Sequence, residues 1–238
     1  MKLVLMRHGQ TSTNLTGALD TAEPGSPLNA EGERQARAAV KTWEELGLPD
    51  PQLIVTSNLI RTHQTARPLE ERFALTRIQN GGANEVQAGK LEMASDLASV
   101  EQYVRTIGAW MQGDTQVRME GAESGAEILA RFNRVVAQAA DEVGADGCAV
   151  IVAHGAIIRY WSYMNSPEIT FALAATKPVS NASLTVFEGE PGNFSAQIWS
   201  SRPVEDWEVD ESVTELRPSK ELLDKVLGTP KKSIGNKR

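Results

Sequence analysis

Cysteine, histidine and long apolar runs are all scarce in this chain of 238 residues. Cys148 is the only cysteine, which excludes a disulfide framework and a thiolate-bound metal cluster, and we expect it to be a buried, free thiol. Only four apolar residues separate Lys2 from Arg7, too few for the apolar core of a secretory signal. No run approaches the length of a membrane span. Together these absences favour a protein of the reducing cytoplasm.

An excess of positive charge is also lacking. Lysine and arginine number 24 against 31 acidic residues, so the formal net charge is −7. This balance argues against broad nucleic-acid binding, which requires a basic face. An anionic ligand would need a locally positive pocket, because the mean field of the protein repels it. The length and the hydrophobic fraction of 41% are typical of one globular α/β domain with insertions.

Apolar runs and helical patterns alternate along the chain. The runs typical of buried strands lie at 3–6, 53–55 and 149–153. Helical patterns are expected at about 29–46, 59–73, 95–111, from 124 and from 157, with Asn29, Ser95 and Ser124 as N-caps. Two further strands are expected at 183–187 and 194–199, and a loop at 80–89. The alternation predicts an α/β fold with its ligand site at the carboxyl edge of the sheet.

Polar residues follow each of the three central strands. Arg7-His8-Gly9 ends the first, a segment containing Arg61 follows the second, and His154-Gly155 ends the third. Parallel strands end at one edge, so two arginines and two histidines should converge there on an anion. A neutral histidine in such a place can act as nucleophile or base. The alternative is a solvated strand end, and for His63 in mid-helix we prefer a solvated or half-packed side chain.

Seven ordered segments resemble those of the histidine phosphatase superfamily, in its phosphoglycerate mutase-like branch. They span about residues 1 to 200, and the ordered set is far more specific than any one segment. The segments are Arg7-His8-Gly9-Gln10-Thr11 with Asn14, then 28–36, 57–66, 85–92, 122–124, 152–159 and 181–183. The resemblance implies a three-layer α/β/α sandwich with a mostly parallel central sheet flanked by helices.

The resemblance also implies a chemistry for individual residues. His8 would attack phosphorus and carry a phosphohistidine, while Arg7, Arg61 and His154 would hold the phosphoryl oxygens. Glu85 would protonate the leaving alkoxide and later take a proton from water. The alternative for Glu85, taken without the resemblance, is a solvated loop carboxylate. No metal or other cofactor is required. The implied substrate-binding residues are Arg7, Gln10, Asn14, Arg61, His154 and Ala156.

Three functions fit these residues. The leading interpretation is hydrolysis of a small phosphomonoester, with phosphoglycerate mutase activity second and a non-catalytic phosphate-binding module third. The glycolytic mutases carry Glu-Arg-His-Tyr-Gly at the glutamate and a long lid after it. Here Glu85 is followed by Val86-Gln87-Ala88 and by a short segment before Glu123, which favours hydrolysis. The expected partner is a small phosphorylated metabolite, neither nucleic acid nor membrane, and a homo-oligomer is left open.

Departures from the family pattern concern the surroundings of the site. Thr62 stands where alanine is usual, Ala156 replaces a glycine, Met93 replaces a glycine, and the loop Asp20–Pro27 is longer than usual. These positions bear on the substrate, not on the reaction. The predicted domains are a catalytic domain at 1–200, an extension at 201–229 whose apolar stripe Leu222-Leu223-Val226-Leu227 suggests a helix, and a basic, disordered tail at 230–238.

Overall fold

A seven-stranded mixed sheet forms the centre of the computed structural model, which describes residues 1–218. The strand order is β3-β2-β4-β1-β5-β6-β7. The first four strands are parallel, and the last three add antiparallel pairings at one side. The strands are β1 (Lys2–Arg7), β2 (Leu53–Thr56), β3 (Ile78–Gln79), β4 (Cys148–Ala153), β5 (Leu184–Glu190), β6 (Asn193–Trp199) and β7 (Arg202–Pro203).

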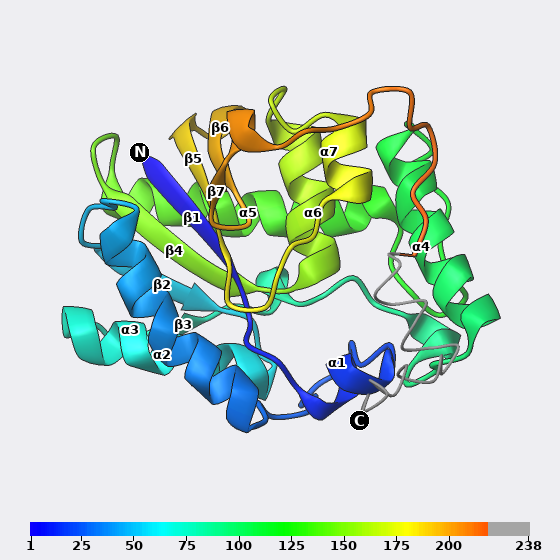
Figure 1. The fold of residues 1–238 in the computed structure, drawn as a ribbon, viewed down its shortest axis with the longest axis horizontal. Helices are drawn as coiled ribbons and strands as arrows, with labels where there is room; N and C mark the ends of the chain where they lie inside the picture. The colour runs from blue at the N-terminus through cyan, green and yellow to red at the C-terminus, as the bar shows by residue number, and fades with distance from the viewer. Residues whose placement is uncertain (219–238) are drawn as a thin grey trace, which may run out of the picture.

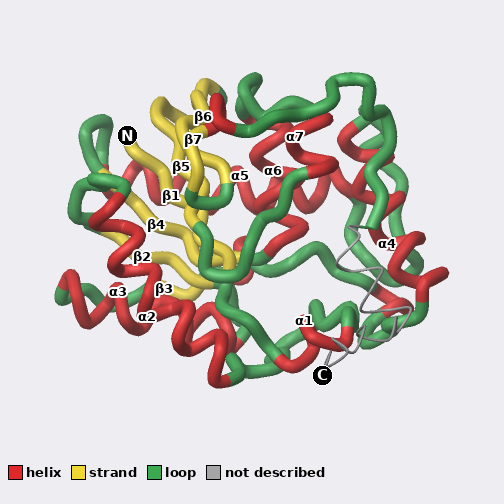
Figure 2. Tube along the Cα trace, in the orientation of Figure 1, coloured by secondary structure: helices red, strands yellow, loops and turns green. Residues whose placement is uncertain are grey.

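Helices cover both faces of this sheet (Figures 1 and 2). On one face α2 and α3 pack against it, and the other face is covered mainly by α4, α5, α6 and α7. The predicted three-layer α/β/α fold is therefore confirmed. The helices are α1 (Ser12–Thr16), α2 (Ala30–Glu45), α3 (Ile60–Phe73), α4 (Leu97–Met111), α5 (Gly125–Val143), α6 (Gly155–Asn165) and α7 (Phe171–Thr176).

The two-sided covering explains the unbroken apolar strands. In β1, Leu3 and Leu5 pack toward α4, α5 and α6, whereas Val4 and Met6 pack toward α2 and α3. A strand buried on both faces needs apolar residues at every position. Cys148 begins β4 and is buried, as predicted, and burial raises the pKa of its thiol to about 11.

The helix starts agree with the predicted caps at two of three places. Asn29 accepts the amide of Gly32 at 2.8 Å, and Ser124 forms a capping box with Glu127. The expectation for Ser95 is wrong, because Asp96 is the cap and accepts the amide of Ser99 at 3.0 Å. A carboxylate at this position also opposes the positive end of the helix dipole.

Short elements were the ones that periodicity missed. The helices α1 and α7 and the strand β3 are each too brief to show a repeating apolar pattern. Within the predicted loop 80–89, Gly81–Ala83 forms a 3₁₀ turn, and a second one follows at Gly89–Leu91. Thr11 and Asn14 form a capping box that begins α1.

The described part of the C-terminal extension packs on the domain. Arg202 in β7 pairs with Trp199 in β6, and the indole N–H of Trp207 donates to the Trp199 carbonyl at 3.2 Å. Leu216 is buried against Gly108 of α4. The stripe at 222–227 and the tail at 230–238 lie outside the described residues. Within residues 1–218, no helix combines the length and the apolarity that crossing a membrane demands.

An aromatic cluster joins α5 and α6 to the hairpin of β5 and β6. The Trp161 ring lies 5.7 Å from Phe132, 5.3 Å from Phe187 and 5.7 Å from Phe194, measured between centroids. Trp161 is 1% exposed, and its indole N–H donates to Asn133 Oδ1 at 2.7 Å. The cluster ties the antiparallel side of the sheet to the helical layer above it.

Removal of this central ring should be costly. We expect Trp161→Ala to lower the free energy of unfolding by about 3–5 kcal/mol, because the substitution leaves a large cavity that the neighbouring side chains cannot fill. Met164→Ala on the same helix is the control, since Met164 is 37% exposed and should change stability by no more than about 0.5 kcal/mol. Urea unfolding measures both. Equal losses would contradict this view of the core.

Candidate active site

The ends of three adjacent strands bring two histidines together. β2, β4 and β1 lie side by side, and His8 and His154 follow β1 and β4 directly. Their ring centroids are 5.2 Å apart, and the side chains are almost completely buried, at 3% and 0% exposure. The sequence-predicted meeting of His8 and His154 is thus present in the fold. His63 lies apart on α3, half-buried, with its Nε2 2.8 Å from the carbonyl oxygen of Ser57.

His8 is held in one orientation and one tautomer. Its Nδ1 lies 2.7 Å from the carbonyl oxygen of Gly9, which can only accept, so Nδ1 carries the proton and Nε2 has the lone pair. Burial lowers the pKa of His8 well below its ordinary value, and the charges of Arg61 and Arg7 lower it further. Asn181 fixes the backbone from the other side by donating to the His8 carbonyl at 3.0 Å. His8 is therefore a neutral imidazole with its lone pair on Nε2.

Each of the two arginines donates a hydrogen bond to a backbone carbonyl. Arg7 Nη1 donates to the Val179 carbonyl at 2.6 Å, and Arg61 Nη2 donates to the Asp20 carbonyl at 2.7 Å. Arg61 is 3% exposed, and burial lowers the pKa of its guanidinium while Asp20 opposes that shift. Within the described residues, Nε and Nη1 of Arg61 have no hydrogen-bond partner. Buried donors without partners point to an anionic ligand.

Asp20 is a site residue that sequence reasoning missed. Its Oδ2 lies 3.6 Å from Arg61 Nη1 and accepts from the Ser26 amide at 2.9 Å and the Thr13 hydroxyl at 2.8 Å. Burial would raise the pKa of this carboxyl, but the bonds from Ser26 and Thr13 and the charge of Arg61 hold it below its usual value. The unusual length of the loop Asp20–Pro27 was the available signal, because this loop packs on Arg61.

The loop passes so close to Arg61 that its position 25 has room only for glycine. Gly25 has a φ of 70°, and a Cβ there would stand 2.3 Å from Arg61 Nη1. The loop is also fastened to the 85–92 segment, since Glu92 accepts the amides of Thr21 and Ala22 at 2.9 and 3.0 Å. The loop thus forms a fixed wall beside the Arg61 guanidinium.

His154 is linked to two hydroxyl groups. Its Nε2 lies 2.8 Å from Ser57 Oγ, which lies 3.0 Å from Thr62 Oγ1. Burial lowers the pKa of His154 well below its ordinary value, with Arg61 and His8 contributing. Its Nδ1 has no partner among the described residues. The departure at Thr62 therefore adds a hydroxyl to the support of His154, and this hydroxyl also donates to the Leu59 carbonyl at 2.8 Å.

Glu85 stands at the N-terminus of α6. Its Oε1 accepts the amides of Val86 and Ile157, each at 2.9 Å, and its Oε2 accepts the amide of Ala156 at 3.1 Å. His154, the N-cap residue of α6, makes no side-chain capping bond, so Glu85 caps the helix instead. The amides of Ala156 and Ile157 are occupied by the Glu85 carboxylate.

The side-chain oxygens of Gln10 and Asn14, two of the implied substrate-binding residues, accept hydrogen bonds from other residues of the protein. Gln10 Oε1 accepts from Asn29 Nδ2 at 3.1 Å. Asn14 Oδ1 accepts from the Thr11 amide at 3.1 Å and from Asn181 Nδ2 at 3.2 Å. The side-chain N–H groups of Gln10 and Asn14 are therefore what these residues can offer a ligand. Asn181, outside the predicted site set, joins Asn14 to the backbone of His8.

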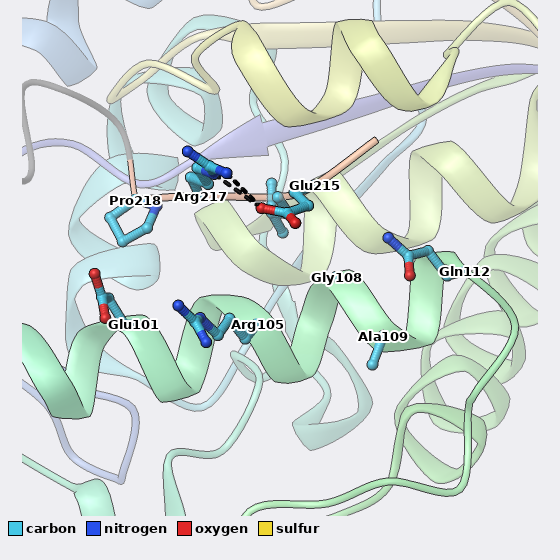
Figure 3. A pocket seen from close by; sticks show the side chains of 9 residues that line it. Glu101, Arg105, Gly108, Ala109, Gln112, Glu215, Arg217 and Pro218 are labelled. Atoms are coloured by element: carbon cyan, nitrogen blue, oxygen red, sulfur yellow. Dashed lines mark hydrogen bonds and ion pairs between the residues drawn. The ribbon is translucent and has the colours of Figure 1, made fainter. Parts of the chain in front are cut away.

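A separate hollow lies against α4, away from these residues (Figure 3). Its charged members come from α4 and from the segment that ends at Pro218. The lining residues are Glu101, Arg105, Gly108, Ala109, Gln112, Glu215, Leu216, Arg217 and Pro218. None of them is a predicted site residue. Among residues 1–218, no three His, Cys, Asp or Glu side chains are grouped so that they could hold a metal ion.

The two buried imidazoles and the Arg61 guanidinium together form a site whose charge suits an anion. The family model of the histidine phosphatase superfamily (branch 1) matches residues 3–202. The chain belongs to this superfamily.

Several relatives span most of the chain. A glucosyl-3-phosphoglycerate phosphatase of Mycobacterium tuberculosis (strain ATCC 25618 / H37Rv) is 33% identical over 214 residues, covering 83% of this chain and 91% of the relative. A PE-PGRS family protein of the same strain is 32% identical over 217 residues, or 84% of this chain, but the match spans only 36% of that longer relative. A probable phosphoglycerate mutase of Yersinia enterocolitica is 30% identical over 158 residues, covering 65% of this chain and 70% of the relative.

Solved structures show the same fold. A mycobacterial glucosyl-3-phosphoglycerate phosphatase in complex with VO3 superposes with a TM-score of 0.68 at 26% identity, covering 84% of this chain and 98% of that one. An Escherichia coli protein described as a putative α-ribazole-5′-phosphate phosphatase has a TM-score of 0.67 at 21% identity, covering 85% of this chain and 97% of that one. The second likeness bears on the fold alone.

The buried neutral imidazoles should make stability depend on pH. An unfolded histidine takes up its proton near pH 6.5, whereas the folded pKa values of His8 and His154 lie well below this. Below pH 6.5 the unfolded state therefore binds more protons than the folded state does. The free energy of unfolding has its full value above that pH and decreases as the pH falls below it. We expect the double variant His8→Gln/His154→Gln to flatten this fall in urea unfolding without phosphate between about pH 7 and pH 5. An unchanged slope would contradict the burial of neutral rings.

Proposed function

We propose that this chain is a phosphatase that hydrolyses a small phosphomonoester through a phosphohistidine at His8. The observation that carries the proposal is the bond from His8 Nδ1 to the Gly9 carbonyl at 2.7 Å, which leaves Nε2 as the nucleophilic atom in a buried, cationic site. A phosphate monoester is an anion whose oxygens suit the arginine donors. The proposal extends to catalysis without a metal ion and to a cytoplasmic location.

The first step transfers the phosphoryl group to His8. Nε2 attacks phosphorus as the ester P–O bond breaks, and Arg7, Arg61 and His154 stabilise the charge on the phosphoryl oxygens. Glu85 gives a proton to the leaving alkoxide. Its Oε2 accepts one amide bond whereas Oε1 accepts two, so Oε2 is the oxygen better able to hold that proton.

The second step returns the enzyme to its starting state. Glu85, now ionised, takes a proton from a water molecule as the water oxygen attacks phosphorus, and the bond between phosphorus and Nε2 breaks. Inorganic phosphate leaves, and His8 is again a neutral imidazole. Splitting the displacement in two lets one pocket stabilise both transition states.

The relatives support hydrolysis and a phosphorylated metabolite as substrate. The match to the named glucosyl-3-phosphoglycerate phosphatase covers 83% of this chain and 91% of the relative. The structure of a mycobacterial glucosyl-3-phosphoglycerate phosphatase with VO3 supports the expectation that vanadate, a mimic of phosphorus at the transition state, inhibits this chain.

Mutase activity is the second candidate, because probable phosphoglycerate mutases also match. A mutase must keep the phosphorylated enzyme away from water and rebind the intermediate. The Val86-Gln87-Ala88 segment and the short chain before Glu123 favour hydrolysis instead.

Loss of the nucleophile should abolish turnover. We expect His8→Ala to lower kcat on 4-nitrophenyl phosphate by about 10³-fold or more, with wild-type activity unaffected by a metal chelator. Arg34→Ala on the exposed face of α2 is the control and should behave as wild type. Phosphate release by His8→Ala at the wild-type rate would eliminate His8 as nucleophile.

The choice between hydrolysis and mutase activity can be made on one substrate. With 3-phosphoglycerate, the phosphatase proposal predicts that any turnover releases inorganic phosphate and forms no 2-phosphoglycerate, because the phosphoryl group passes to water. Coupling to enolase detects 2-phosphoglycerate, and a molybdate assay detects phosphate in the same sample. Sustained enolase-coupled turnover would overturn the ranking.

A further inference from the structure

Side chains of the helices α5 and α4 donate hydrogen bonds to the backbone of the segment that carries Glu85. Arg131 of α5 donates from Nη1 to the carbonyls of Gly82 and Asn84, both at 2.8 Å, and from Nη2 to the carbonyl of Glu85 at 2.9 Å. Tyr103 of α4 donates to the carbonyl of Val86 at 2.9 Å. These bonds cover backbone carbonyls on both sides of the Glu85 side chain.

Arg131 is buried, and several hydrogen bonds fix its guanidinium group. It is 9% exposed, and its Nε donates to both oxygens of Glu123, at 3.2 and 3.0 Å. The planar guanidinium can satisfy a carboxylate and three carbonyls at once, which an ammonium group on a flexible stem cannot. Burial of the side chain strengthens these bonds by excluding water.

Other hydrogen bonds hold the ends of this segment and the Asn84 side chain. The Asn80 amide donates to the Thr56 carbonyl at 2.9 Å, Asn84 Oδ1 accepts the Asn58 amide at 2.9 Å, and the Ala88 amide donates to Thr21 Oγ1 at 3.0 Å. Residues 80–88 contain one 3₁₀ turn and no strand, so no sheet ladder orders them. Gly82 lies so close to α5 that a Cβ would stand 2.5 Å from Val135 Cγ2. The bonds of Glu85 to α6 orient its carboxylate only if the backbone already brings it there.

We propose that Arg131 is a positioning residue: it fixes the backbone of Gly82–Val86 so that the Glu85 carboxyl stands at the N-terminus of α6, and it thereby sets the efficiency of leaving-group protonation. This inference rests on the proposed function. All the bonds of Arg131 described here go to Glu123 and to backbone carbonyls, so it acts through Glu85. Tyr103 supports the same segment from its other end.

This role has a signature that general damage to the fold lacks. Phenol is a much weaker acid than 4-nitrophenol, so release of phenolate depends on a proton donor whereas release of 4-nitrophenolate hardly does. A displaced Glu85 therefore slows phosphoryl transfer from phenyl phosphate selectively, whereas the loss of its role as base in the second step affects both esters alike. A damaged pocket slows both esters alike.

The test compares kcat/KM on these two esters, because kcat/KM reports the steps up to phosphoryl transfer and leaves out hydrolysis of the phosphohistidine, which is common to both esters. The variants are Arg131→Met, Arg131→Lys and Tyr103→Phe, and Arg134→Met on the exposed side of the same helix is the matched control. We expect Arg131→Met to lose on the order of 10²-fold on phenyl phosphate but no more than about 3-fold on 4-nitrophenyl phosphate. Arg131→Lys and Tyr103→Phe should lose less, with the same selectivity, and Arg134→Met should match wild type on both.

A second measurement links Arg131 to Glu85. In a Glu85→Gln background, Arg131→Met should cause little further loss on phenyl phosphate, because both changes remove the same proton transfer. Independent, multiplying losses, or equal losses on both esters, would overturn the positioning role. If Arg131→Met fails to fold, Arg131→Lys and Tyr103→Phe decide the question. Failure of the proposed function itself is recognised separately, because wild type would then hydrolyse neither ester or would do so without His8.

Discussion

Burial of cationic and imidazole groups at the carboxyl edge of β1, β2 and β4 is the constraint on which the site depends. Arg61, His8 and His154 are removed from water, and burial pushes all three pKa values toward the uncharged form. The histidines accordingly remain neutral, whereas an arginine keeps its charge. The result is a fixed positive charge next to two neutral imidazoles, a combination that exposed side chains in water could not maintain.

The chain stabilises this edge mainly with its own backbone. Carbonyls of Gly9, Asp20 and Val179 take donors from His8, Arg61 and Arg7, and Asp20 adds a carboxylate to Arg61. Carbonyls are partial charges, so they hold the guanidinium groups without cancelling their attraction for an anion. A protein with a net charge of −7 thereby keeps a locally positive site. Glu85 sits at the border of that site, with its charge shared among three amides.

Sequence reasoning reached the residues whose position follows from strand ends. His8 and His154 could be placed together because each ends an apolar run and parallel strands share an edge. It did not reach Asp20 or Arg131, whose partners Arg61 and Glu85 lie 41 and 46 residues away. These contacts depend on how a loop folds back and on which side of α5 faces the sheet, and neither has a local pattern. Asp96 as the cap of α4, one residue past the expected Ser95, shows the usual limit at helix boundaries.

The central claim is that His8 carries the phosphoryl group during turnover. The most direct measurement is mass spectrometry of enzyme quenched in base during hydrolysis of a phosphomonoester, since phosphohistidine survives base. Trypsin releases residues 8–34 as one peptide in which His8 is the only histidine. We expect a phosphoryl group on that peptide, located at His8, which disappears when substrate is exhausted. Turnover with this peptide unmodified, or with the phosphoryl group on His154, would contradict it.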